Sequence, residues 1–208
     1  MSSPKLKLYH GAPSRSSIVL WMLEELGEPY EVELVGFKSG ANLQPAYLAI
    51  NPMGKVPTLI DEGVAISEVA AICCHLADKY PKAGLAPAIT DPLRGPYLKW
   101  LFWGPSCFEP AIIDHHLKRP AGPRAMVGWI DYDTTLDILA AALAKGPYLL
   151  GERFTAADVV VGSGVNWGLQ FGTVTARPVF AAYAERLRAR PAMRRQMERD
   201  ASYAAHGA

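Results

Sequence analysis

Three serines and one arginine surround the point where a short predicted strand gives way to the first predicted helix. The stretch reads Pro13-Ser14-Arg15-Ser16-Ser17 and is followed by the apolar sequence IVLWMLEEL. A helix start, a hydroxyl donor and a nearby cation each stabilise an adjacent anion. The turn could therefore hold an anion next to a hydroxyl donor. A serine at such a place also serves as a plain helix N-cap, so that interpretation stays open.

A second group of candidates lies in the sequence NPMGKVPTLID, residues 51–61. A proline that enters a strand removes a hydrogen-bond donor, so Pro57 belongs at a sheet edge or a functional turn. A cis peptide before Pro57 would leave the backbone N–H and C=O of Val56 free to pair with an extended ligand. The alternative is an ordinary turn proline.

The third candidate is Glu68, in the sequence SEVAAI directly after a predicted hairpin. An acid in the first turn of a helix complements the helix dipole, which is a sufficient structural reason for it. The functional interpretation is that Glu68 binds a ligand ammonium, while the open N–H groups of the same turn bind a carboxylate. An amino-acid head group requires both.

The motifs NPMGKVPTLID, SEVAAI and GERFTAADVVVG follow one another in the order seen in cytosolic glutathione transferases. The chain resembles this family, in a bacterial form with a theta-like serine loop, over nearly its whole length. The resemblance implies a thioredoxin-like domain that binds glutathione, an all-helical domain with an apolar co-substrate site, and a homodimer. It also implies that glutathione is a substrate rather than a cofactor.

The resemblance assigns roles to the glutathione-binding positions. Val56, before a cis Pro57, would pair with the cysteinyl backbone of glutathione, and Glu68 would hold the γ-glutamyl ammonium. Lys55 stands where the family often places a polar or basic residue near the glycyl carboxylate. The family commonly has Ser or Thr directly after that Glu, whereas this chain has Val69. Losing that hydroxyl contact costs roughly 1 kcal/mol, so we expect weakened glutathione binding.

Alignment through LWMLEELGEPYE places the activating residues of the family's subclasses on this turn. The theta-type serine falls on Ser14, and the tau- and phi-type serine falls on Pro13, which has no hydroxyl. The tyrosine of alpha-, mu- and pi-type enzymes falls on Tyr9. The beta-type cysteine falls near Ala12, so a mixed disulfide with the protein is not expected at this turn.

Transferase chemistry requires the thiolate of glutathione. An unperturbed thiol has a pKa of about 8.5, and lowering it by about two units requires roughly 2.7 kcal/mol of preferential stabilisation of the anion. We expect Ser14 to donate a hydrogen bond to the sulfur, with Ser16 as the second choice and Tyr9 as the third. Arg15 would act in the field of the thiolate or brace the turn.

The second half of the chain carries one conspicuous acid and many aromatic residues. Thr155 and Asp158 fit a capping box, so Asp158 is predicted to be structural. Most of the aromatics are expected in the core, with Trp103 and Phe108 as candidates for the apolar co-substrate pocket. The arginines near the C-terminus are expected to form a solvated helix face.

The elements that must position these residues are predicted to alternate between strands and helices in the first part of the chain and to be helices in the rest. Strands are predicted at 5–10, 29–35, 56–61 and 64–67, with helices at 16–27, 41–50 and 67–81. This βαβ-α-ββα order is that of an α/β thioredoxin-like domain, over residues 1–82. A linker at 83–91 leads to an all-α domain at 92–208. Its predicted helices span 93–117, 125–146, 155–172 and 178–201, with a kink near Gly104 and Pro105.

Composition excludes several other classes of protein. Among 208 residues, 21 Lys and Arg balance 20 Asp and Glu, which argues against nucleic-acid or membrane-surface partners. Apolar leader and membrane-span patterns are missing, so we expect a cytoplasmic protein. Three cysteines without CxxC spacing, and histidines without paired spacing, predict no metal site.

Two other functions remain open beside the transferase. One is a non-catalytic glutathione-binding or scaffolding protein, which Val69 and the ambiguous donor would suit. The other is a narrow glutathione-dependent isomerase or lyase. Zeta-type isomerases carry an SSCS-like signature, and the PSRS sequence here matches it poorly.

Overall fold

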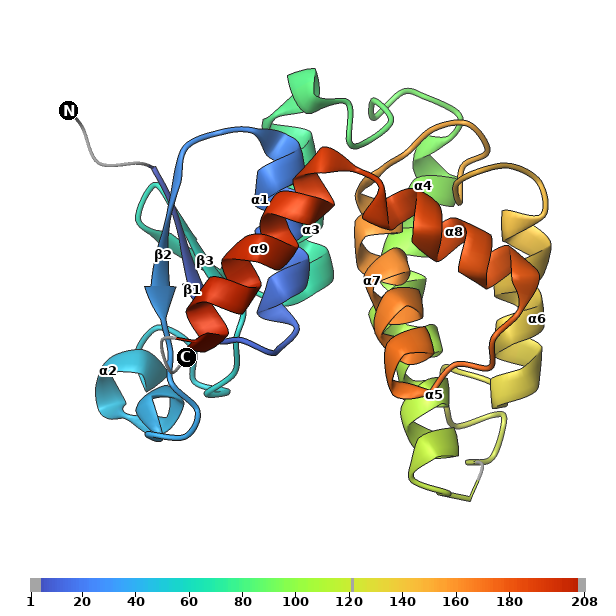
Figure 1. The fold of residues 1–208 in the computed structure, drawn as a ribbon, viewed down its shortest axis with the longest axis horizontal. Helices are drawn as coiled ribbons and strands as arrows, with labels where there is room; N and C mark the ends of the chain where they lie inside the picture. Colours follow the sequence, from blue (N-terminus) through green and yellow to red (C-terminus); the bar gives the residue numbers. More distant parts are fainter. Residues whose placement is uncertain (1–4, 121, 206–208) are drawn as a thin grey trace. The chain divides into compact units, whose positions relative to one another are not determined.

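A computed structural model describes residues 5–120 and 122–205, which fall into two compact units (Figure 1). Unit 1 combines residues 1–83 with residues 190–208, and unit 2 runs from Gly84 to Ala189. The all-helical region was expected to extend to residue 208. Instead, the last helix belongs to unit 1, because it packs against the first helix of that unit.

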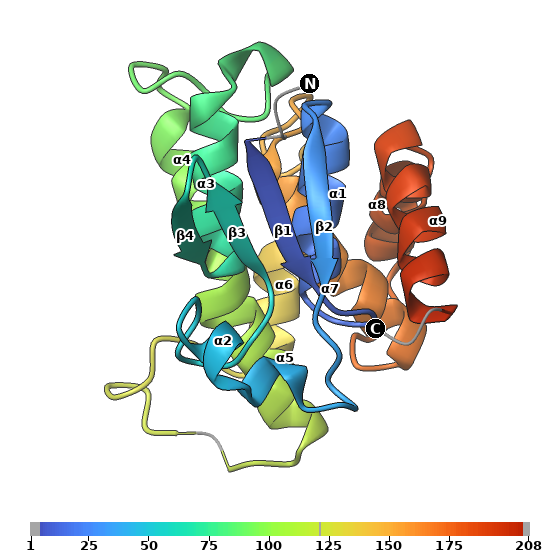
Figure 2. The ribbon, with the colours of Figure 1, turned by 90° about the vertical axis from the view of Figure 1, so that its left-hand side faces the viewer.

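Unit 1 has a four-stranded sheet with helices. Its elements are β1 (Leu6–His10), α1 (Ser16–Leu26), β2 (Tyr30–Leu34), η1 (Ala41–Leu43), α2 (Pro45–Leu48), β3 (Thr58–Asp61), β4 (Val64–Ser67), α3 (Val69–Lys79), η2 (Pro81–Ala83) and α9 (Pro191–Ala205). The strands lie in the order β2-β1-β3-β4, as Figure 2 shows. β1 and β2 are parallel, and the other two pairs are antiparallel. The predicted thioredoxin-like βαβ-α-ββα order is confirmed.

Helix α1 forms because its apolar residues recur at helical spacing and nearly all of its surface is covered. Val19, Leu20, Met22 and Leu23 have no exposed surface. The helix ends at Gly27, whose φ of 76° is left-handed and favours glycine. The predicted stop at Gly27 is therefore confirmed.

Helix α9 is fixed to α1 by ion pairs, and the two lie side by side in Figure 1. Arg190 bonds to Glu25 through two nitrogens, at 2.6 and 2.7 Å. Arg195 and Arg199 both bond to Glu24, at 2.6 and 2.9 Å. Three arginines of this region thus hold α9 on unit 1, so the expected solvated face is only part of their role.

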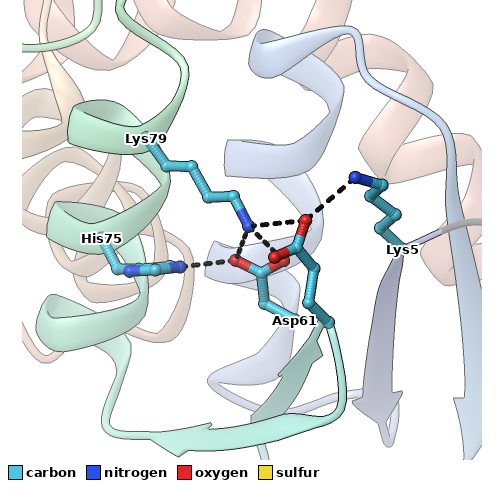
Figure 3. A network of polar contacts seen from close by, with 5 residues as sticks. Lys5, Asp61, His75 and Lys79 are labelled. Atoms are coloured by element: carbon cyan, nitrogen blue, oxygen red, sulfur yellow. Dashed lines mark hydrogen bonds and ion pairs between the residues drawn. The ribbon is translucent and has the colours of Figure 1, made fainter.

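A second ionic network joins the β3–β4 hairpin to α3 (Figure 3). The carboxylate of Asp61 contacts Nε2 of His75 at 2.6 Å and accepts from Nζ of Lys79 at 2.7 Å. Beside it, Lys5 pairs with Glu62 at 3.0 Å. Burial raises the pKa of Asp61, but the bonds from His75 and Lys79 outweigh it and hold that pKa below 3.8.

Unit 2 is helical. Its elements are α4 (Arg94–Trp103), the π-helical turn η3 (Gly104–Phe108), α5 (Glu109–His116), α6 (Tyr132–Leu143), α7 (Ala156–Phe171) and α8 (Pro178–Arg188). The expected kink near Gly104 and Pro105 is this π-turn, which widens the helix around a proline that cannot donate. Helix α6 begins later than expected, because the Asp131 side chain caps it by accepting from the N–H of Thr134 at 2.9 Å.

Asp158 lies at the start of α7 with no exposed surface. Its carboxylate accepts from the N–H groups of Leu149 and Thr155 and from the hydroxyl of Tyr183, each at 2.9 Å. The Thr155 hydroxyl contacts it at 3.2 Å, and the capping box is complete. Burial raises the pKa of Asp158 despite these bonds. The predicted capping box is confirmed.

Among the described residues, no helix combines the length and apolar character needed to cross a membrane. Within the same residues, His, Cys, Asp and Glu side chains form no group of three or more suited to a metal ion.

Candidate functional site

Three segments leave the sheet of unit 1 at the same end. In the register, Tyr9 of β1 is opposite Thr58 of β3, and Thr58 is opposite Ser67 of β4. β1 and β4 end there and β3 begins there. The β1–α1 turn, the segment 55–57 and the segment 68–69 are therefore neighbours at this end, which we call the site end.

Ser14 lies in the turn directly before α1, and its hydroxyl contacts the first residue of that helix. Its carbonyl accepts from the N–H of Ser17 and its Oγ accepts from the N–H of Ser16, each at 3.1 Å. Its Oγ also lies 2.7 Å from Oγ of Ser16. The side chain is half-buried. The N-cap of α1 is Arg15, which makes no side-chain cap bond, so Ser14 is not the plain N-cap; its Oγ braces the turn by accepting from the N–H of Ser16, which does not use the Ser14 proton.

The two other ranked donors lie in different surroundings. Ser16 has no exposed surface, so it lies behind Ser14 and cannot itself contact a ligand. Tyr9 is 8% exposed and packs edge-on against Tyr47, with ring centroids 5.5 Å apart. Alternation along β1 directs Tyr9 to the face opposite His10. Arg15 is exposed beside the turn.

The Val56–Pro57 peptide bond is cis, as predicted. Two buried side chains hydrogen-bond to the loop that precedes this peptide bond. Asn51 donates to the carbonyl of Lys55 at 2.9 Å, and the Tyr47 hydroxyl donates to the same carbonyl at 2.6 Å. Val56 is 8% exposed and the Lys55 side chain is exposed. Two hydrogen bonds therefore hold the carbonyl that directly precedes Val56.

Gly54 is required for that loop. Its φ is 61°, and a Cβ there would lie 3.0 Å from the carbonyl oxygen of Asn42 and 3.1 Å from the side chain of Leu43. Asn42 in turn donates to the Gly54 carbonyl at 2.9 Å. A side chain at this position would displace the loop that carries Val56.

Glu68 has an uncommon backbone for a residue with a side chain, with φ at 70° and ψ at 119°. It is the N-cap of α3, its carbonyl accepting from the N–H of Ile72 at 2.9 Å. Ser67, where the predicted helix 67–81 was expected to begin, is instead the last residue of β4. The first N–H groups of α3, from Val69 onwards, have no helical acceptor. Strain of this kind concentrates at functional sites.

The aromatic candidates of unit 2 lie along η3 and the end of α4. The rings of Trp103 and Phe108 stack with centroids 5.5 Å apart, and Trp103 is half-buried. Phe108 is only 3% exposed, because it packs against Gly164 of α7, where a Cβ would lie 2.9 Å from its ring. A cavity of about 330 Å³ in this unit is lined by other residues, among them His115 and Tyr132.

Sequence reasoning missed two residues next to the turn, His10 and Asp200. His10 has no exposed surface, and its Nδ1 lies 2.8 Å from Oγ of Ser16. Its other ring nitrogen faces Asp200 of α9. A signal for His10 was available in the sequence. This residue ends a predicted strand, and the residues on the same face of that strand, Leu6 and Leu8, are apolar, so a polar ring is expected to be buried there. Asp200 gave no signal, because only the docking of α9 brings it here.

Comparison with known proteins gives consistent results. Family models described as the N-terminal and C-terminal domains of glutathione S-transferase match residues 14–79 and 111–167. Glutathione S-transferase 3 of Zea mays is 32% identical over 213 residues, covering 91% of this chain and 92% of that protein. Disulfide-bond oxidoreductase YfcG of Escherichia coli is 28% identical, covering 90% and 92%.

Among solved structures, the theta class glutathione S-transferase from the citrus canker pathogen Xanthomonas axonopodis pv. citri, with glutathione bound, is similar over the whole fold. Its TM-score is 0.75 at 32% identity, covering 93% of this chain and 97% of that one. Three findings point to the same family. They are the sequence motifs, the thioredoxin-like sheet with a second, helical unit, and these relatives. The chain belongs to the glutathione S-transferase family of enzymes.

Proposed function

We propose that this protein adds the thiolate of glutathione to apolar electrophiles, with Ser14 donating a hydrogen bond to the sulfur. One observation carries the proposal: the Ser14 hydroxyl, the cis bond at Val56 and the start of α3 at Glu68 meet at one end of one sheet. These are the groups that a thiol, a peptide backbone and an amino-acid head group need.

Each part of glutathione has a partner there. The backbone of Val56 pairs with the cysteinyl unit as an added strand would. The N–H groups at the start of α3 bind the γ-glutamyl carboxylate, and Glu68 binds the neighbouring ammonium. Lys55 reaches the glycyl carboxylate. Glutathione acts as the substrate, and the reaction needs no cofactor.

The electrophile is the less defined partner. Trp103, with the stacked ring of Phe108 behind it, offers an apolar aromatic surface in unit 2. We propose that this surface contributes to electrophile binding, and that the active form is a cytoplasmic homodimer. Light scattering of the purified protein measures the oligomeric state.

A second candidate is the glutathione-dependent reduction of disulfides, favoured by the name of the Escherichia coli relative. The same activated thiolate would attack a disulfide sulfur instead of a carbon. The turn itself has no cysteine, so the thiol would come from glutathione alone. Rates with hydroxyethyl disulfide and with a chlorinated dinitrobenzene separate the two candidates.

The test begins with retention on immobilised glutathione and the rate with the chlorinated aromatic. We expect both. Retention without turnover of either substrate would indicate a binding protein, and failure of both would refute the proposal.

A pair of variants tests the head-group assignment. Glu68→Gln removes the charge that meets the ammonium, and we expect about 10- to 100-fold weaker glutathione binding by calorimetry. Glu31→Gln, on the exposed edge strand β2, removes the same charge elsewhere and should leave affinity unchanged. Equal affinities for the two variants would remove Glu68 from the site.

A further inference from the structure

Four polar side chains of unit 1 form a continuous chain that ends at the site end. Oδ1 of Asp200 lies 3.0 Å from Nε2 of His10, and Nδ1 of His10 lies 2.8 Å from Oγ of Ser16. Oγ of Ser16 lies 2.7 Å from Oγ of Ser14. The four residues come from α9, β1 and the start of α1, and we call them the relay chain.

The relay chain is sealed from water along most of its length. His10 and Ser16 have no exposed surface, and the Asp200 side chain is 21% exposed. Nε2 of His10 and Oδ1 of Asp200 are buried and have no hydrogen-bond partner among the described residues, so their 3.0 Å contact is an ion-pair distance rather than an aligned hydrogen bond. Ser17 donates to the second oxygen of Asp200 at 2.7 Å, which fixes the carboxylate. Ser14, half-buried, is the end nearest the proposed thiol.

The titratable groups facing His10 come from α9. They are Asp200 and Tyr203, whose ring centroid lies 5.3 Å from that of His10. The group facing it from α1 is Ser16. Further along this face, four other titratable side chains bond to one another near the opposite end of β1: Glu24, Tyr30, Arg195 and Arg199.

The Ser16 hydroxyl also reaches the Gly11 carbonyl at 3.3 Å, but its shorter contacts with Ser14 and His10 allow two arrangements in which every bond of the relay chain is made. Ser16 has one proton, and one of its lone pairs accepts from the N–H of Gly11 at 3.1 Å. If His10 Nδ1 is bare, it accepts the Ser16 proton, Ser16 accepts that of Ser14, and Ser14 offers a lone pair outward. If Nδ1 carries a proton, every bond reverses and Ser14 offers its proton outward.

We propose that the relay chain takes up the proton of the glutathione thiol. This rests on the proposed function. In the free enzyme the Asp200 carboxylate, 3.0 Å from Nε2, favours the tautomer of His10 with its proton on Nε2 and Nδ1 bare. The S–H bond breaks, its electron pair stays on sulfur, and its proton passes to Oγ of Ser14. The Ser14 proton moves to Ser16, and the Ser16 proton moves to Nδ1 of His10.

The products are a thiolate and an imidazolium that faces the Asp200 carboxylate. Because every hydrogen bond of the relay chain is now reversed, Ser14 donates to the sulfur that it has just deprotonated. The same hydroxyls thus first conduct the proton and then stabilise the thiolate. After the product leaves, the proton returns along the same path to water at Ser14. His10 and Asp200 are positioning residues in this scheme, since they act on the thiol through Ser16 and Ser14.

The direct test is nitrogen-15 NMR of the His10 ring in the wild-type protein, with His10→Asn identifying its signals. With glutathione bound at pH 7, we expect both ring nitrogens to be protonated. With S-methylglutathione, which has no thiol proton, we expect a neutral ring with its proton on Nε2. The same protonation state with both ligands would overturn the relay.

A pH profile gives an independent readout. Asp200→Asn should lower kcat/KM about 10-fold at pH 6.5 and approach the wild-type value within about twofold at pH 9.5, where free glutathione is already ionised. An equal loss at every pH is what damage to the fold produces, and it would overturn the proposal.

Arg195→Gln is the matched control, because it removes an ion pair of the same helix while Glu24 keeps Arg199. Its profile should keep the wild-type shape. If Arg195→Gln also lowered kcat/KM only at low pH, the loss seen for Asp200→Asn would be explained by the docking of α9 rather than by the carboxylate of Asp200. Wild-type protein that neither binds nor conjugates glutathione would refute the proposed function. Normal turnover with a parallel Asp200→Asn profile would refute the relay alone.

Discussion

Two helices of this protein, α1 in unit 1 and α7 in unit 2, begin with a hydroxyl beside buried polar side chains. At α7 every bond made by Asp158 leads to a group inside the protein: Leu149, Thr155 and Tyr183. At α1 the corresponding network runs from half-buried Asp200 and buried His10 through Ser16 to the half-buried Ser14.

The two networks differ at their ends. In the network of Asp158 every polar group has a partner inside the protein, whereas the network of α1 ends at a hydroxyl that a ligand can reach. A closed network such as that of Asp158 contributes to folding, because removing any member leaves buried donors unpaired. An open network leaves one donor for a ligand, so its removal affects chemistry more than folding. Variants of the two helix starts should therefore separate stability from activity.

The largest effect is expected at the closed network. Asp158→Ala leaves the N–H groups of Leu149 and Thr155 and the hydroxyl of Tyr183 without an acceptor in a fully buried place. We expect a loss of roughly 3–5 kcal/mol in the free energy of unfolding and a Tm lower by about 10 °C. Calorimetry measures both, and conjugation per folded molecule should persist.

Asp133→Ala is the control for this prediction, because Asp133 is an exposed acid in the first turn of α6. It should change the free energy of unfolding by no more than about 0.5 kcal/mol. If Asp158→Ala kept its stability but lost all turnover, Asp158 would belong to the chemistry and the comparison would fail.

The open network should give the opposite pattern. Ser14→Ala removes a donor to the thiolate, and we expect the apparent pKa of bound glutathione to rise by about one unit, with about 10-fold lower kcat/KM at pH 6.5. The loss of the bond that its Oγ accepts from the N–H of Ser16 should cost about 1 kcal/mol or less in the free energy of unfolding. Ser39→Ala removes an exposed hydroxyl elsewhere in unit 1 and should change neither quantity. An unchanged pH–rate profile for Ser14→Ala would assign the donor role to Tyr9 or to backbone groups.

Unit 1 also contains a closed network, around Asp61 (Figure 3). Because the folded pKa of Asp61 lies below its ordinary value of 3.8, its contribution to stability is complete above about pH 5. The contribution is lost as the pH falls through the folded pKa.

We expect Asp61→Asn to cost about 1–2 kcal/mol at pH 7, since the half-exposed partners are partly screened, and less at pH 3. Urea unfolding at the two pH values measures this. Glu62→Gln, at an exposed neighbour, should cost less than about 0.5 kcal/mol. A penalty for Asp61→Asn that does not depend on pH would contradict the ionic account.

The smallest effect is expected from adding a donor to the site end. Val69→Ser restores the hydroxyl that the family commonly has, and we expect glutathione binding to tighten about fivefold, or about 1 kcal/mol. Val64→Ser makes the same change on the exposed strand β4 and should leave affinity unaltered. Calorimetric titration measures the affinity for glutathione. Equal affinities of Val69→Ser and the wild-type protein would show that the backbone N–H groups of α3 already satisfy the γ-glutamyl carboxylate.

Much of the fold could be predicted because its signals are local. The left-handed stop at Gly27, the hairpin turn after Asp61 and the capping box at Thr155 depend on residues within a few positions of one another. The start of α6 could not be placed, because the periodic pattern continues before the cap at Asp131 and only the cap ends it.

The sequence by itself determined the order of elements and the serines at the start of α1, since these depend on local patterns. The cis bond at Pro57 followed only from the family resemblance, because the local sequence also allowed an ordinary turn proline. Only the tertiary structure decided that Ser16 is buried and that Ser14 remains half-exposed. It alone also decided that Asp200, 190 positions along the chain from His10, completes the network behind them. The physical reason is that the docking of α9 depends on ion pairs between distant residues, which no local pattern specifies.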